Sequence, residues 1–148
     1  MHDYNARRED FAEVAVSARM WANLNPEAFM QGDLSIDDVI NSRMISSPLS
    51  KLDCCLVTDG AAAIILKSKE KAKDGPKTPV YLLGAAMEHH HRMISAMPNL
   101  TTTSAKESSK RALEMSGYRH DEMHTLQLYD AFTINTILFL EDIGFCEK

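Results

Sequence analysis

Hydrophobic residues near the N-terminus recur at three- and four-residue spacing. Between residues 6 and 23, apolar side chains such as Phe11, Val14 and Trp21 alternate with charged ones in this period. The pattern is typical of an amphipathic helix with one apolar face. Asn25-Pro26 ends the predicted helix, because a residue that precedes proline avoids the α region.

Two serines open further predicted helices. Ser35 stands three positions before Asp38, and Ser104 stands three positions before Glu107. In such a capping box the serine oxygen accepts the third amide of the helix, and the acidic side chain binds back to the serine amide. The first box predicts a short helix. The second predicts a longer helix that ends before Gly117, since glycine favours the position after a helix.

Continuous apolar runs predict buried strands. Gly60–Leu66 and Val80–Ala86 are short and apolar, which is typical of strands covered on both faces, and residues 124–129 form a third predicted strand. A last helix, capped by Asp130 and ending near Ile143, is apolar on nearly every side, so we expect it to be buried. Three strands and two helices hardly cover such a helix. We therefore expect the chain to continue or to assemble elsewhere.

The composition is that of a globular protein. The chain has 148 residues, of which 45% are hydrophobic and 25% charged, a size that suits one domain. A net charge of -5 disfavours nucleic acid as a partner, because such binding depends on clustered Lys and Arg. The apolar runs fall short of the ~20 residues that cross a bilayer, and the N-terminus has no apolar leader. A cytoplasmic protein without a membrane partner is the expectation.

Two polar clusters leave alternatives open. Residues 67–79 interleave lysines with acidic residues and end in glycine and prolines, so they predict a linker in which the lysines either bind ligand phosphates or are solvated. Glu88 precedes three consecutive histidines. On a strand only His89 and His91 share a face, so the cluster is either a polar rim or a partial metal site, and we predict no metal site.

The cysteines indicate reduced thiols. The chain has three cysteines, Cys54, Cys55 and Cys146. Their number is odd and no two of them form a CxxC pair, so neither a secreted disulfide framework nor a structural zinc site is predicted. We expect all three to be structural rather than nucleophilic.

Several segments, in order along the chain, resemble those of the thiolases. Thr58–Ala63 is similar to the NDGAAA strand that closes the N-terminal half of those proteins, and Leu126–Thr133 looks like their NEAF segment. Further segments resemble the start of the loop-domain helix or lean toward the sterol-carrier-protein-x and lipid-transfer branch: Tyr4–Asp10, Ser42–Ile45, Leu52–Cys55 and Leu140–Cys146.

The resemblance implies an α/β protein with an incomplete, thiolase-like layered fold of helices and mixed sheet. Residues 1–57 would be a helical segment like the loop domain, and residues 58–78 the last strand of the N-terminal half with a linker. Residues 79–148 would begin the C-terminal half. In the family, the acylated cysteine and the histidine of the GHP motif belong to segments that have no match here. We therefore expect this chain alone to be inactive.

One position matches a catalytic residue of the family. Tyr129 aligns with the Asn of NEAF, which in thiolases holds a water of the oxyanion hole. A phenol donates a hydrogen bond and has a pKa near 10, so Tyr129 either polarises a substrate oxygen or only fills space at the end of a strand. Cys55 aligns with a serine that touches the pantetheine arm of coenzyme A, and His89 and His91 are candidates for lining the acyl channel.

The resemblance implies an acyl-CoA function. The first reading is a thiolase-like acetyl-CoA acetyltransferase or lipid-transfer protein, in which coenzyme A thioester is the substrate and no separate cofactor is needed. The second is a steroid side-chain retro-aldolase that uses Tyr129 and works with a small OB-fold partner. The third is a non-catalytic binding module. A homodimer or larger oligomer is expected for the first two.

Overall fold

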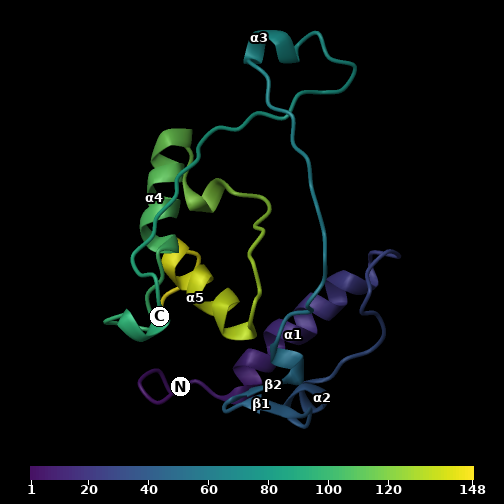
Figure 1. Cartoon of the computed structure of the whole chain (residues 1–148), viewed down its shortest axis with the longest axis vertical. Helices are drawn as coiled ribbons and strands as arrows, with labels where there is room; N and C mark the ends of the chain where they lie inside the picture. The colour runs from purple at the N-terminus through teal and green to yellow at the C-terminus, as the bar shows by residue number, and fades with distance from the viewer.

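The computed structural model describes the whole chain, Met1–Lys148. Helices predominate, and one two-stranded hairpin is the only sheet (Figure 1). The elements are α1 (Arg8–Asn23), α2 (Ile36–Ile40), β1 (Met44–Ser46), β2 (Leu49–Ser50), η1 (Lys51–Asp53), α3 (Lys69–Ala72), η2 (Ile94–Ala96), α4 (Ala105–Ser116), η3 (His120–Glu122) and α5 (Thr133–Ile143). None of these helices combines the length and apolarity that a bilayer crossing requires.

The predicted N-terminal helices are confirmed. α1 occupies the predicted range and buries Phe11 and Ala12 on its inner face. α2 begins with the predicted capping box, in which the Asp38 amide donates to Ser35 Oγ at 3.1 Å and the Ser35 amide donates to Asp38 Oδ2 at 2.9 Å. Val39 of α2 is 1% exposed. The small apolar core therefore lies where α1 and α2 pack together.

α4 spans the predicted range, but its predicted capping box is wrong. The Ser104 side chain makes no capping hydrogen bond because its backbone is already helical, at φ -65° and ψ -13°. Thr103 takes over instead, since its hydroxyl oxygen accepts the Ala105 amide at 3.2 Å. Gly117 ends the helix in the left-handed region, as predicted, with φ 75°.

The three predicted strands are not formed. Residues 60–66, 80–86 and 124–129 have no sheet partner, and their apolar side chains face solvent: Ile64 is 82% exposed and Val80 97% exposed. A strand requires hydrogen bonds from a neighbouring strand, which this chain does not place beside them. Figure 1 shows residues 57–68 and 77–92 as long extended connections that run to α3 and back.

The hairpin of β1 and β2 was not predicted, because the hydrophobic residues between positions 43 and 55 show no regular spacing. β1 and β2 pair antiparallel, with Met44 opposite Ser50.

α5 differs in two respects from its prediction. It begins at Thr133 with Phe132 as the N-cap residue, so Asp130 is not its cap. Its apolar side chains are half-buried rather than buried, although α1 and α4 both pack against it. The two fully buried residues of this helix are polar, Thr133 and Asp142.

Candidate functional site

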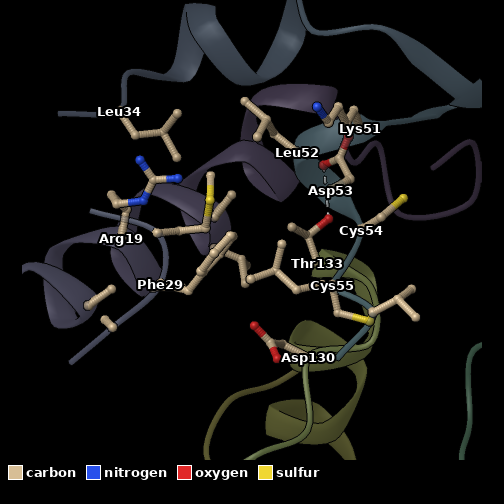
Figure 2. A pocket seen from close by; sticks show the side chains of 18 of the residues that line it. Arg19, Phe29, Leu34, Lys51, Leu52, Asp53, Cys54, Cys55, Asp130 and Thr133 are labelled. Atoms are coloured by element: carbon tan, nitrogen blue, oxygen red, sulfur yellow. Dashed lines mark hydrogen bonds between the residues drawn. The ribbon is translucent and has the colours of Figure 1, made fainter. Parts of the chain in front are cut away.

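An apolar cavity of about 700 Å³ opens between α1 and the start of α5. One wall is the face of α1 that carries Val14 and Ala18, and a second is the loop around Phe29. Residues 51–57 and 129–133 complete it, and 15 of its 20 lining residues are hydrophobic. Figure 2 shows Arg19, Phe29 and Leu34 on one side of this cavity, and Cys55 and Asp130 on the other. The cavity suits a ligand with an apolar body.

Backbone contacts bring Cys55 and Tyr129 to the same cavity. The Cys55 amide donates to the Ala131 carbonyl at 3.0 Å, and Cys54 forms an isolated antiparallel bridge with Phe132. This short pairing holds the segment after η1 against the segment before α5. The structure thus places together the two predicted site residues that lie furthest apart in the sequence.

A buried carboxylate reinforces this junction. Asp53 is 4% exposed, and its Oδ1 accepts the Thr133 hydroxyl at 3.0 Å, the contact drawn as a dashed line in Figure 2. Its Oδ2 accepts the amide and the hydroxyl of Ser50, both at 2.8 Å. Arg8 of α1 lies 4.0 Å from the same oxygen. One side chain therefore joins α1, η1 and α5 beside the cavity.

The environment favours the protonated form of the Tyr129 phenol. The neighbouring Cys55 side chain raises the pKa of Tyr129 most, and burial and the charge of Asp130 add to the effect. Burial also raises the pKa of the Cys54 thiol, and the negative charge of Asp53 adds to the effect. Tyr129 is 71% exposed and lies at the rim of the cavity, where it offers a neutral hydrogen-bond donor.

Arg19 is the cation on the α1 wall of the cavity. Its Nη1 donates to the backbone carbonyls of Gln31 and Gly32, at 3.3 and 3.5 Å. These bonds tie α1 to the loop that carries Phe29.

His89 and His91 lie elsewhere. Both are exposed on the extended segment that precedes η2, and neither lines the cavity of Cys55 and Tyr129. Glu88 makes the ion pairs in this region. Its Oε2 lies 2.5 Å from Arg111 Nη2, and its Oε1 lies 3.8 Å from His90 Nε2. No three His, Cys, Asp or Glu side chains gather as metal ligands in this cluster or elsewhere.

Sequence reasoning missed Asp53 and Thr133. A signal for Asp53 was present, since Ser50 and Asp53 have the spacing of the capping box that η1 uses. Nothing local marks Thr133 as its partner, because the two residues are separated by 80 positions. Arg19 and Phe29 were also missed, since only the fold places them at a cavity.

Comparisons with known proteins agree with this architecture. Residues 86–148 match a family described as thiolase C-terminal domain-like. The whole chain is 34% identical to the benzoylsuccinyl-CoA thiolase subunit BbsB of Thauera aromatica, and 36% identical to a steroid side-chain-cleaving aldolase of Thermomonospora curvata. It covers 39% of each of these proteins, so the chain spans about two fifths of the length of the curated relatives it matches.

A solved structure, that of an Ltp2-ChsH2(DUF35) aldolase, superposes on 99% of this chain with a TM-score of 0.87 and 32% sequence identity. The match covers 40% of that aldolase chain. It confirms the predicted thiolase-like α/β fold class. Together with the family match over residues 86–148, it is consistent with a segment of a thiolase-superfamily protein.

Proposed function

We propose that the chain supplies the acyl-binding wall and a hydrogen-bond donor to a protein that forms or cleaves a carbon–carbon bond of a β-keto or β-hydroxy acyl-CoA. The observation that carries the proposal is the convergence of Tyr129 and Cys55 on one apolar cavity of about 700 Å³. An acyl chain or a ring system fits such a lining, whereas a highly polar substrate would lose its hydration without new partners.

Tyr129 has the chemistry that this reaction class needs. Forming or breaking the bond next to a thioester places negative charge on the thioester oxygen, as an enolate. A neutral donor that points at this oxygen stabilises the charge as it develops. A phenol whose pKa is at or above the ordinary value of 10.0 keeps its proton near neutral pH for that role. Cys55 acts through its contact with the phenol, and we assign it no nucleophilic step.

A retro-aldolase is the second candidate, and the similarity to two aldolases favours it. In that reaction the hydroxyl of a β-hydroxyacyl-CoA loses its proton, the bond between Cα and Cβ breaks, and Cβ leaves as a carbonyl. The electron pair of the broken bond becomes the enolate, which then takes up a proton at Cα. Tyr129 would donate to the enolate oxygen or exchange a proton with the β-hydroxyl. The similarity to a DUF35 complex supports a small partner chain for this version.

Substitution of the phenol tests the proposal. The complete protein to which this segment contributes, with any chain that copurifies, is assayed for acetoacetyl-CoA thiolysis and for cleavage of a β-hydroxyacyl-CoA with a steroid side chain. Tyr129→Phe should lower the reaction that the wild type performs by about 10²-fold or more. Tyr118→Phe is the matched control, because Tyr118 follows α4 and lies outside the cavity.

The two assays also separate the candidates. Activity in the first assay alone supports a thiolase, and activity in the second alone supports the retro-aldolase. Unchanged turnover of Tyr129→Phe would remove the phenol from the mechanism. Acyl-CoA binding in calorimetry with no turnover in either assay would favour a binding module instead.

A further inference from the structure

We propose that Asp53 is a positioning residue: by accepting the Thr133 hydroxyl it holds the Tyr129–Thr133 segment against the Cys54–Cys55 segment, so that the Tyr129 phenol stays at the cavity wall. The inference rests on the proposed function, because it assigns to Asp53 the placement of the donor used there. Asp53 itself touches neither substrate nor reacting atoms.

The two oxygens of the Asp53 carboxylate have separate partners. Oδ2 accepts the amide and the hydroxyl of Ser50 and so completes the local capping of η1. Oδ1 accepts the hydroxyl of Thr133, which is 80 positions away. A carboxylate that only capped η1 would need one of these oxygens. The second oxygen is used for the contact with α5.

Burial makes the link between Asp53 and Thr133 specific. Asp53 is 4% and Thr133 5% exposed, so water cannot readily replace either partner. The nearest cation, Arg8, is 4.0 Å from Oδ2 and therefore does not compete for Oδ1. A buried acceptor that loses its donor is destabilised, which keeps Thr133 in place.

The position of Thr133 determines that of Tyr129 through a short run of backbone. Thr133 is the first residue of α5, and Ala131 just before it accepts the Cys55 amide at 3.0 Å. Between these two fixed points the chain forms a bridge from Phe132 to Cys54. Tyr129 precedes Ala131 by two residues, so a shift at the start of α5 moves the phenol relative to Cys55.

A pair of substitutions in the full chain tests the link. Thr133→Val removes the hydroxyl and keeps the shape of the side chain, whereas Thr133→Ser keeps the hydroxyl. Thr136→Val is the matched control, because Thr136 is another α5 threonine whose hydroxyl has no hydrogen-bond partner. The readout is the titration of the Tyr129 ring carbon by NMR in tyrosine-labelled protein, with the signal assigned by its loss in Tyr129→Phe.

We expect Thr133→Val to move the Tyr129 titration down toward the usual tyrosine value of 10.0, because the phenol leaves Cys55. Thr133→Ser and Thr136→Val should titrate like the wild type. A Thr133→Val protein that unfolds at a lower temperature yet keeps the wild-type titration would overturn the inference, since Asp53 would then be purely structural. If Thr133→Val does not fold, Thr133→Ala removes the same hydroxyl without placing a methyl group against the carboxylate.

The test is independent of the proposed function. Failure of the function shows as unchanged turnover in Tyr129→Phe, whereas failure of the positioning role shows as an unchanged Tyr129 titration in Thr133→Val. In an active protein, Thr133→Val should lower kcat about 10-fold and leave KM nearly unchanged, as expected when a donor used in the transition state is displaced. Thr133→Ser should restore kcat.

Discussion

The carboxylate of Asp142 in α5 binds both the amide and the hydroxyl of Thr103, at 2.5 and 2.8 Å. The Asp142 side chain is fully buried, and its other oxygen lies 3.1 Å from Lys148 Nζ. Thr103 in turn accepts the first amide of α4, from Ala105. A single residue near the end of one helix therefore organises the start of the other.

Asp142→Ala should destabilise the packing of α4 on α5. The substitution leaves the Thr103 amide and hydroxyl without an acceptor, and hydrogen bonds to a charged group contribute about 1.5–3 kcal/mol. We expect a decrease of that size in the free energy of unfolding, measured by urea denaturation. Asp121→Ala is the control, because Asp121 pairs with Arg119 on the surface and should have little effect. Equal midpoints for the two variants would contradict the capping role.

Gly84 is the point where the extended segment after α3 meets α4. A Cβ at this position would overlap the Ala112 carbonyl oxygen and lie 3.1 Å from the Ser116 amide nitrogen. Both are backbone atoms of a helix, so they cannot move aside without distorting it. The residue has to be glycine for the segment to pack this closely.

Gly84→Ala should therefore destabilise the protein by about 1–3 kcal/mol, the usual cost of forcing extra atoms into a packed site. Gly60→Ala provides the matched control, since a Cβ there meets nothing within 4 Å. Urea unfolding of both variants, followed by circular dichroism of the helices, makes the comparison. A Gly84→Ala protein as stable as Gly60→Ala would show that the segment does not pack on α4 in solution.

The helices could be predicted because their signals are local. The capping box of Ser35 and Asp38 and the glycine at position 117 each depend on a few neighbouring residues. The strand predicted over residues 60–66 does not form, because a strand depends on a pairing partner that the local sequence does not reveal. An apolar run indicates that burial would stabilise the segment. The exposed side chain of Ile64 shows that this chain alone does not bury it.

The same distinction applies to the site. Tyr129 and Cys55 were identified through family resemblance, and the structure brings them to one cavity. The link from Asp53 to Thr133 depends on two segments that meet only in the fold. Asp53 carries a local capping signal, but nothing in its own segment marks its link to Thr133.

The three thiols should differ in reactivity. Burial raises the pKa of Cys54, and its sulfur donates to the Ser50 carbonyl at 3.3 Å, so little thiolate forms near neutral pH. Cys55 and Cys146 are exposed. In a time course with iodoacetamide, read by mass spectrometry of peptides, Cys54 should be alkylated last. Alkylation of Cys54 at the rate of Cys146 would mean that the start of the cavity wall opens in solution.

The pH dependence of Tyr129 provides the last prediction. Its pKa is raised above the usual value of 10.0, chiefly by the neighbouring Cys55 side chain, so folding favours the protonated phenol. The donor is therefore fully present below pH 10.0 and is lost only as the pH rises through the raised pKa. Cys55→Ala should lower the midpoint of phenolate absorbance for this tyrosine, isolated by subtracting the titration of Tyr129→Phe. Cys146→Ala, which removes a distant exposed thiol, should not. An unshifted midpoint in Cys55→Ala would mean that Cys55 does not raise the pKa of Tyr129, so the two side chains would not interact at the cavity.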